Sequence, residues 1–434
     1  MVSCYNSRNQ FGAIALSGQT DGRNDVRQFL IVDRSVDEGS CELQALLACA
    51  YEQKLRPSCQ CREPAVPMYI ARFDGQYVVK RMPLTGRDHD PACPSYEPPY
   101  ELSGLGPLVG NAIRLDETTG TAALAFDFSL SKRGSRAAAA PSGEPSDTIR
   151  NETKKLSLRA VLHYLWEVGE LTEWTSLWSG RRGWGRVRGS LINAAKQMTT
   201  RGKPLSDILF VPEVFHAEDR EGIAARRAAA LSGLQAAGSG PRTLMLLVGE
   251  VKDSTPARDG WKISIRHMPF PFMIDDGAWR RLNTRYATEL EIWRSNEAFH
   301  LVAIATFGIS GAGIASVEEI ALMVVNQNWI PFETVHEQRL LDRLADLRRK
   351  SVKSLRFNLS RDQPVVCVTL PEQCPVPVAM CVVPAGADEE YERTLAEMLA
   401  ARPEMTPWIW RIADGDMPPL PVCHDGAAGR TTSE

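Results

Sequence analysis

The sequence has no apolar run of the length needed to cross a bilayer, which is roughly 18 residues or more. Met1–Gln10 contains neither a basic nor an apolar segment, so we expect no secretion signal and a cytoplasmic location. An excess of one charge is also lacking, because 50 Lys and Arg residues oppose 53 Asp and Glu residues, for a net charge of −3. This balance excludes a chain that coats nucleic acid or membrane through its overall charge, but not one with a local basic patch.

Two common catalytic motifs are absent from the sequence as well. Ser310–Ile314 is glycine-rich, but it lacks the Lys-Ser/Thr pair of a P-loop, so we predict no nucleotide-phosphate loop. No Gly-x-Ser-x-Gly nucleophile motif is present. Five histidines have no partner at catalytic or metal-ligand spacing: His163, His216, His267, His300 and His336.

The pattern of hydrophobic residues indicates an α+β protein. A chain of 434 residues with 44% hydrophobic and 24% charged residues is typical of two to four globular domains. Runs of strands are mixed with helices without a regular βαβ alternation, which favours α+β over a doubly wound sheet. We predict a zinc-stapled strand-rich module at residues 1–130, a flexible linker at 131–153 and a helical segment at 154–240. A mixed strand and helix domain at 241–330, a C-terminal α/β domain at 331–421 and a disordered tail at 422–434 follow.

Periodicity places the individual elements within these parts. Helices are predicted at residues 42–53, 155–169, 184–198, 220–234, 276–294, 333–349 and 388–399. Strands are predicted at residues 28–33, 68–73, 77–81, 208–211, 243–251, 261–267, 300–307, 319–325, 365–370 and 379–383. Asp74-Gly75 lies between the second and third of these strands, and Asp-Gly in this position predicts a hairpin.

The most informative residues for function are two closely spaced ligand pairs, Cys59-x-Cys61 and His89-x₃-Cys93. Structural zinc takes four Cys and His ligands in a tetrahedron, commonly Cys₃His. The predicted hairpin lies between the pairs and can bring them together, and nearby prolines stiffen the turns that carry them. We therefore predict a structural zinc ion bound by Cys59, Cys61, His89 and Cys93.

The alternative is that these four residues are unrelated buried cysteines and a surface histidine. Cys41 and Cys49 are reserve ligands, although Cys49 lies on the apolar side of its helix and is expected in the core. In a reducing compartment disulfides are not expected among the ten cysteines. The late cysteines are expected as small buried hydrophobic residues: Cys367, Cys374, Cys381 and Cys423.

Several motifs together resemble a family of uncharacterised bacterial proteins, catalogued as domain of unknown function 1173. The residues that carry the resemblance are Cys59-x-Cys61, Met68–Ala71, Lys80–Pro83, His89-x₃-Cys93-Pro-Ser-Tyr96, Leu102–Gly104, Trp184, Trp329–Glu333, Lys353–Asn358 and Met417–Pro421. The resemblance implies one architecture over nearly the whole chain and an association with plasmid and integrative-element genes. It implies no reaction.

Two places invite comparison with nucleases. A hydrophobic strand ends in Glu250-Val251-Lys252, and the Glu-x-Lys motif of restriction-endonuclease-like enzymes binds Mg²⁺ together with an earlier Asp, here Asp207. The alternative is that Lys252 marks a solvated strand end. In the C-terminal domain the order of elements is similar to the same fold, but the strands lack the metal-binding Asp and Glu-x-Lys. Glu337 alone cannot hold a metal, so that domain is expected to be catalytically empty.

A basic segment with one tryptophan is the best candidate for contact with nucleic acid. It contains Arg181, Arg182, Trp184, Arg186 and Arg188 and no acidic residue. Arginines suit phosphates and tryptophan offers a stacking surface. The alternative is a buried Trp184 with solvated arginines. A second basic cluster suits a helix C-terminus: Arg343, Arg348, Arg349, Lys350, Lys353 and Arg356.

Three hypotheses for function follow. The first is a non-enzymatic zinc-bearing accessory protein of a mobile element that contacts DNA, RNA or a partner protein. The second is a Mg²⁺-dependent nuclease that uses Asp207, Glu250 and Lys252. The third is a pure protein-interaction factor, for which Trp408 and Trp410 are the best anchors, although paired tryptophans also fill cores.

Overall fold

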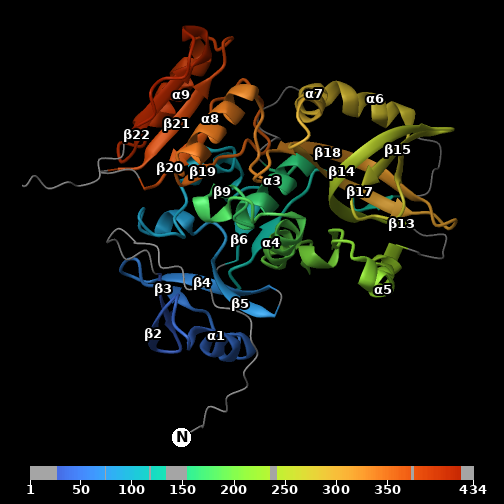
Figure 1. The fold of residues 1–434 in the computed structure, drawn as a ribbon, viewed down its shortest axis with the longest axis horizontal. Coiled ribbons are helices and arrows are strands. Elements are labelled where there is room, and N and C mark those ends of the chain that lie inside the picture. The colour runs from blue at the N-terminus through green and yellow to red at the C-terminus, as the bar shows by residue number, and fades with distance from the viewer. Residues whose placement is uncertain are drawn as a thin grey trace, which may run out of the picture.

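The computed structural model describes residues 27–73, 75–116, 119–132, 154–234, 242–372 and 376–421. Within these ranges the chain is a mixed α+β protein with eight α-helices and several separate sheets. Figure 1 shows the N-terminal module at the bottom, two central helices, a curved sheet on the right and the C-terminal sheet at the upper left. The predicted tail and all but Ser131–Lys132 of the predicted linker lie outside the described residues.

Every predicted helix is present, although one of them is divided into two. The helices are α1 (Leu43–Glu52), α3 (Leu158–Val168), α4 (Trp184–Lys196), α5 (Arg220–Leu231), α6 (Asp276–Arg285), α7 (Ala287–Ser295), α8 (Val335–Asp346) and α9 (Glu389–Ala400). The single helix predicted over residues 276–294 was wrong, because α6 ends and α7 begins at Tyr286. Tyr286 lies at the break, where its backbone departs from helical geometry, and its side chain is only 3% exposed.

The N-terminal module is a five-stranded sheet with its own small core. Its strands run in the order β2-β1-β3-β4-β5 and are β1 (Gln28–Ile31), β2 (Arg34–Asp37), β3 (Ser58–Cys59), β4 (Val66–Phe73) and β5 (Gln76–Arg81). The predicted hairpin is confirmed, since β4 and β5 pair antiparallel from Met68↔Arg81 to Phe73↔Gln76. Helix α1 packs its buried residues Leu43, Leu47 and Ala50 into a core shared with Phe29 and Ile31.

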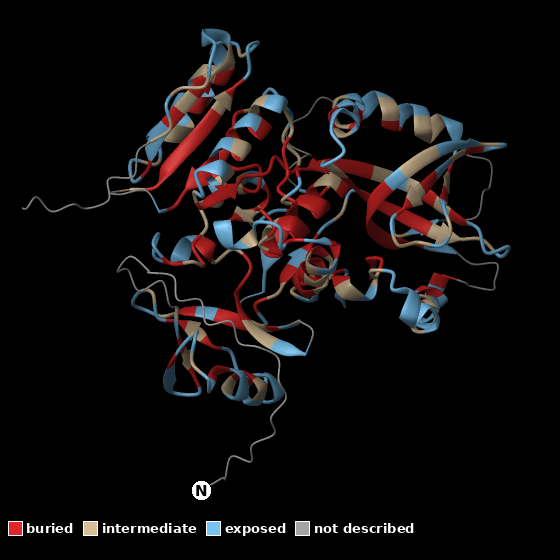
Figure 2. Cartoon of the chain, in the orientation of Figure 1, coloured by how far each residue is buried: buried red, intermediate tan, exposed pale blue. Residues whose placement is uncertain are grey.

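Helices α3 and α4 form the centre of the molecule. Nine of the eleven residues of α3 are buried, and Figure 2 shows this helix red on nearly all sides. The Ser157 side chain caps α3 by accepting a hydrogen bond from the Ala160 amide. A small sheet of order β11-β10-β7-β6 lies beside these helices, with strands β6 (Ile113–Leu115), β7 (Ala122–Leu124), β10 (Met198–Thr200) and β11 (Lys203–Pro204).

The third sheet closes on itself. Its strands are β12 (Leu209–Phe210), β14 (Met245–Ala257), β15 (Gly260–Ile265), β16 (Phe272–Ile274), β17 (His300–Ile309) and β18 (Ala315–Val325). They run in the order β12-β14-β15-β16-β18-β17, and β17 also pairs with β14. The strands β14, β15, β16, β18 and β17 therefore form a closed ring, the β-barrel, while β12 is attached outside it.

The long strand β14 makes closure possible because it serves two neighbours. Its first half, Met245–Glu250, pairs with β17, and its second half, from Val251 to Ala257, pairs with β15. The change occurs at a bulge between Val251 and Asp253. Gly249 lies just before the bulge, where a Cβ would be only 2.5 Å from Cγ2 of Ile265. Glycine thus allows β14 to bend over the barrel.

The C-terminal sheet has the order β22-β21-β20-β19-β9. Its strands are β9 (Glu173–Trp174), β19 (Ser351–Lys353), β20 (Val368–Leu370), β21 (Val378–Val383) and β22 (Thr406–Arg411). β19, β20 and β21 are antiparallel neighbours, and β22 returns parallel to β21 after α9. A short pair, β8 (Ser131–Lys132) with β13 (Arg242–Thr243), completes the described strands.

Candidate metal centre

The predicted ligands come from two segments of the N-terminal module. Cys59 ends β3 and Cys61 follows it, while His89 and Cys93 lie in the loop after β5, beyond the short 3-10 helix Gly86–Asp88. β3 pairs with β4, and the β4–β5 hairpin returns the chain toward β3. The hairpin therefore brings together two ligand pairs that are far apart in the sequence.

The four ligand atoms have the spacing of a tetrahedral metal site. All of them lie within 4.8 Å of one another. The Sγ atoms of Cys59 and Cys93 are 3.8 Å apart, and Nδ1 of His89 is 3.3 Å from Sγ of Cys61 and 3.7 Å from Sγ of Cys93. A zinc ion with Zn–S bonds of about 2.3 Å separates two sulfurs by about 3.8 Å at the tetrahedral angle. The residues present thus fit a zinc-sized ion.

The backbone around the site supports negatively charged sulfur. The amide of Asp90 lies 3.5 Å from Sγ of Cys61, and the amide of Ser95 lies 3.4 Å from Sγ of Cys93. The hydrogen bond with Cys59 is the main factor that lowers the pKa of Cys93 to about 3, and it raises the pKa of Cys59. A cation bound between the sulfurs would displace the proton that these two groups share.

The site is enclosed. Cys59 and His89 are each 1% exposed and Cys93 is 6% exposed, while Cys61 is partly exposed. Cys59 and Cys93 also belong to the core of the module, with Phe29 and Leu47. Four protein ligands fill a tetrahedron and leave no position for a substrate, which is the arrangement of a structural site.

The other cysteines in the described ranges of the chain do not join this cluster. Cys41 and Cys49 are both exposed, so they are not ligands. The expectation that Cys49 belongs to the core was wrong, because α1 turns Leu47 and Ala50 inward instead. Burial is confirmed for Cys367 and Cys381, while Cys374 and Cys423 lie outside the described residues.

The structure does not bring together the three residues of the nuclease hypothesis. Leu209 of β12 lies opposite Leu246 of β14, in parallel register. Asp207 ends a 3-10 helix before this pair, whereas Glu250 lies four strand positions, or ~13 Å, beyond the pair in the direction away from Asp207. Asp207 and Lys252 are exposed, whereas Glu250 is 5% exposed.

Glu250 already has protein partners. Its Oε1 atom forms an ion pair with Nε of Arg266 at 2.8 Å and accepts a hydrogen bond from the ring of His300 at 2.9 Å. The His300 ring is stacked on Trp329, with 4.2 Å between the ring centres. These contacts hold the Glu250 carboxylate in a structural role.

The arginines of the predicted basic patch have mostly structural contacts. Arg182 is 7% exposed and donates to the carbonyl oxygens of Leu171, Glu173 and Asn328. Arg188 donates to the Val211 carbonyl, and the guanidinium of Arg186 lies 5.1 Å from the ring centre of Trp178. Arg181 alone among the four arginines is fully exposed.

The aromatic residue of this patch is not available for stacking on a base. Trp184 is 6% exposed, and its ring nitrogen donates to the Pro212 carbonyl at 2.8 Å. The burial of Trp184 agrees with the alternative interpretation, but the solvated arginines of that interpretation were wrong for Arg182, which is buried as well.

The second basic cluster and the tryptophan pair near the C-terminus are also buried in part. In the second basic cluster, Lys350, Lys353 and Arg356 are each 9% exposed or less. Trp408 and Trp410 are 9% and 1% exposed, and their ring nitrogens donate to the carbonyls of Pro419 and Gly415. The two tryptophans of β22 therefore belong to the core.

Sequence reasoning missed a group of charged residues between the N-terminal module and α3, in which two buried basic residues meet half-buried glutamates. Arg81 forms ion pairs with Glu97 and Glu173, and Lys80 pairs with Glu170. Burial dominates the raised pKa of Glu167, about 7, whereas the pKa of Glu170 is lowered to about 2, mainly by Lys80. The signal was present in the sequence, since Lys80-Arg81 ends an otherwise apolar strand.

Fold and site together define an α+β protein with a Cys₃His candidate metal centre. The chain belongs to the family described as protein of unknown function (DUF1173), whose model matches residues 29–413. Searches among curated proteins and among solved structures found no match. None of the helices in the described residues is both long enough and apolar enough to span a membrane.

Proposed function

We propose that this protein is a non-enzymatic, zinc-stapled accessory protein that binds single-stranded nucleic acid through the β-barrel. Three soft thiolate ligands and one imidazole favour zinc over the hard cations that oxygen ligands bind. The closed ligand set supports a structural role for the metal. The association with a mobile element rests on the family resemblance alone.

The strand order of the β-barrel is the observation that carries the nucleic-acid part of the proposal. From β14 onward the barrel strands pair in the order first, second, third, fifth, fourth and back to first, and α6 and α7 lie between the third and the fourth. This is the arrangement of the OB-fold, a five-stranded Greek-key barrel that binds oligonucleotides on its second and third strands and adjoining loops. The likeness is topological, so the ligand is argued from the residues that follow.

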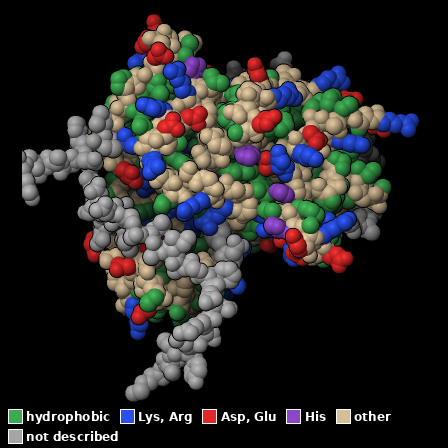
Figure 3. Space-filling model, viewed as in Figure 1, with side chains coloured by type: hydrophobic (Ala, Val, Ile, Leu, Met, Phe, Trp, Pro, Cys, Tyr) green, Lys and Arg blue, Asp and Glu red, His purple; other side chains and the backbone are tan. Residues whose placement is uncertain are grey.

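Exposed basic residues lie on the second strand, β15, and on the turn before it. Lys262 is exposed on β15 and Arg258 on the β14–β15 turn, while the third strand, β16, carries no basic residue. Lys252 on the first strand and Arg266 just after β15 are also exposed, and Asp253 and Asp259 are the acidic residues among them. Figure 3 shows acidic and basic side chains interspersed over the visible face of the molecule. We therefore expect weak, salt-sensitive binding to phosphates, and not high affinity through a strongly positive surface.

Fluorescence anisotropy with labelled single-stranded DNA and RNA, measured over a range of salt concentrations, tests this proposal. The double variant Arg258→Ala, Lys262→Ala should bind more weakly, and the slope of log K against log salt should fall by about 0.7 for each lost phosphate contact. Arg393→Ala, at an exposed position on α9, is the matched control. Unchanged binding in the double variant, or no binding by the wild type at low salt, would contradict the proposal.

The C-terminal domain does not supply a second activity in this proposal. Its order, α8-β19-β20-β21-α9-β22, is the basis for the similarity to a restriction-endonuclease-like fold. No acidic residue lies on β20 or β21, and Glu337 contacts Lys353 at 3.4 Å. A nuclease would need carboxylates on these strands to bind Mg²⁺, so we assign this domain a scaffolding role.

A further inference from the structure

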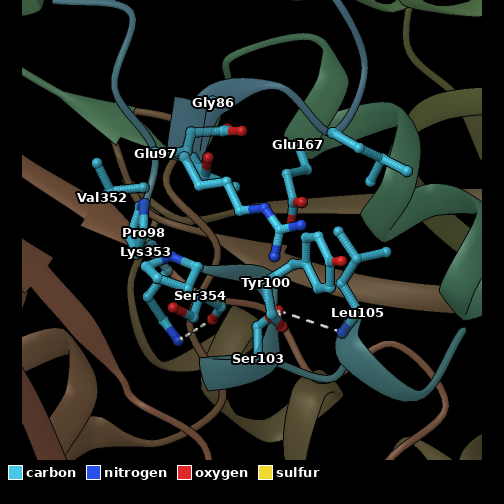
Figure 4. A pocket seen from close by; sticks show the side chains of 14 residues that line it. Gly86, Glu97, Pro98, Tyr100, Ser103, Leu105, Glu167, Val352, Lys353 and Ser354 are labelled. Carbon is cyan, nitrogen blue, oxygen red and sulfur yellow. Dashed lines mark hydrogen bonds between the residues drawn. The ribbon is translucent and has the colours of Figure 1, made fainter. Parts of the chain in front are cut away.

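A polar cavity lies where the N-terminal module meets α3 and the C-terminal sheet. Its lining includes Glu97 and Ser103 from the loop after β5, Glu167 and Thr172 from α3 and the turn after it, and Ser354 beyond β19. Figure 4 shows the Glu167 side chain projecting into this cavity. A smaller cavity shares Glu97 and Glu167 with the first.

The two cavities are too small for an organic substrate. Their volumes are about 30 Å³ and about 10 Å³. One water molecule needs roughly 10–15 Å³ on the same measure. The space therefore suits one small ion with a water molecule or two.

Two buried hydroxyl groups at the cavities have no partner within the described residues. They are Oγ1 of Thr172, which lines the larger cavity, and the hydroxyl of Tyr164, which lines the smaller one. These two residues are 1% and 0% exposed. Buried hydroxyls nearly always have a hydrogen-bond partner, so a bound species that supplies one is expected here.

One carboxylate is also left over. Glu97 and Glu173 pair with Arg81, Glu170 pairs with Lys80, and the Arg182 guanidinium donates to the Glu173 carbonyl. Glu167 makes no hydrogen bond or ion pair in the described part of the chain, although the charge of Arg81 acts on it. Four carboxylates thus face three cationic side chains, and Glu167 carries the surplus.

The other two basic residues at the cavity are already paired elsewhere. Arg87 contacts Glu101 at 2.9 Å, and Nζ of Lys353 donates to the Ser354 carbonyl and lies 3.4 Å from Glu337. Neither forms an ion pair with Glu167. Glu167 is half-buried, so its surplus charge is only partly hydrated and favours either a proton on Glu167 or a cation from solution.

We propose that this cavity binds a small inorganic cation, held by the carboxylates of Glu167 and Glu97 and by the hydroxyl of Thr172. Oxygen ligands select hard cations such as Mg²⁺, Ca²⁺ or an alkali ion, which distinguishes this site from the sulfur-rich metal centre. The ion joins the zinc-bearing module to α3, so its binding stabilises the docking of the two parts.

Thermal unfolding of the zinc-loaded full chain tests the proposal, with K⁺, Na⁺, Mg²⁺ and Ca²⁺ added separately at constant ionic strength. The ion that binds should raise the Tm of the wild type and leave Glu167→Gln unchanged, because the amide removes the surplus charge but keeps the shape. Glu390→Gln, at an exposed position on α9, should respond like the wild type. The ion's effect should be larger at pH 8 than at pH 6, because protons compete with the cation for Glu167.

A second variant separates cation binding from a general effect of charge. Thr172→Val keeps the volume of the side chain but removes one oxygen ligand, so the concentration of cation needed for half of the stabilisation should rise several-fold. Terbium luminescence sensitised by Tyr100, which lines the cavity, reports occupancy directly and should be lost in Glu167→Gln. If none of the four ions stabilises the wild type more than Glu167→Gln, the cavity holds water only and the proposal is overturned.

Discussion

The Sγ atoms of Cys59 and Cys93 lie 3.8 Å apart, although a complete β-hairpin separates the two residues in the chain. Cys59 is fixed by the pairing of β3 with β1 and β4, and Cys93 by the tight turns after β5. The core of the N-terminal module is small, and both sulfurs are part of it. A metal bound at this point therefore contributes directly to the stability of the module.

Replacing Cys59 and Cys61 together by serine should remove the bound zinc and unfold the N-terminal module. The wild type should contain about one zinc per chain, measured by elemental analysis, and circular dichroism should report the loss of strand structure in the variant. Cys41→Ser, Cys49→Ser is the matched control, because both of these cysteines are exposed and outside the cluster. A double variant at Cys59 and Cys61 that keeps its zinc would rule out the ligand assignment.

Gly249→Ala should destabilise the β-barrel by about 1–3 kcal/mol, because the new methyl group would overlap with the Ile265 side chain. Urea unfolding measures the loss. Ile265→Leu should recover part of it in the double variant, since leucine lacks the Cγ2 methyl group that the new Cβ would meet. Gly233→Ala, where nothing lies within 4 Å of the added Cβ, should change stability little. Equal effects at the two glycines would contradict the bend assigned to β14.

Glu250→Gln should lower the free energy of unfolding by about 1.5–3 kcal/mol, because it removes the ion pair with Arg266 and weakens the charged hydrogen bond with His300. Chemical denaturation provides this value. The wild type should show no Mg²⁺-dependent cleavage of single- or double-stranded DNA or RNA. Cleavage that disappears in Glu250→Gln but persists in Glu213→Gln would restore the nuclease hypothesis.

His163 should make the protein sensitive to acid. Burial, followed by the charges of Arg159 and Lys353, lowers its pKa well below the usual value, and its Nδ1 accepts the Phe357 amide proton at 3.0 Å. The folded state keeps His163 neutral, whereas the unfolded chain binds a proton below about pH 6.5. Stability from this residue is therefore present above pH 6.5 and falls by about 1.4 kcal/mol for each pH unit below it.

The measurement for His163 is the pH dependence of urea unfolding between pH 7 and pH 5. His163→Gln keeps an acceptor for the Phe357 amide but does not titrate, so its curve should be flatter than that of the wild type. His216→Gln, at an exposed position, should follow the wild-type curve. Parallel curves for the wild type and His163→Gln would show that His163 is not held neutral.

Local signals in the sequence predicted most of the elements correctly. Asp74-Gly75 predicted the β4–β5 hairpin, and the acidic residue Asp276 predicted the beginning of α6. The spacing of Cys59, Cys61, His89 and Cys93 predicted the cluster, because each pair needs only a short turn to point both ligands the same way. Such features depend on neighbours within a few residues.

Other features could not be predicted, because they depend on contacts between distant segments. Arg182 and Trp184 looked like a surface patch, but carbonyl groups from other parts of the chain satisfy their donors inside the molecule. The sequence suggested Glu250 as a metal ligand, but in the structure His300 of β17 lies beside it and forms a hydrogen bond with it. Long polar side chains can lie on the surface, or in the interior when their polar groups are paired, and composition does not distinguish these two cases.

The sequence by itself determined the ligand set of the metal centre, the hairpin that joins its halves and the start and end of most helices. Only the tertiary structure decided that β14 pairs with both β15 and β17, so that five strands close into a barrel. It also decided that Glu167 lies at a cavity with no ion-pair or hydrogen-bond partner in the part of the chain that the structure describes. The physical reason is that strand pairing and charge compensation depend on which distant groups meet, whereas turns and ligand spacing depend on the residues next to them.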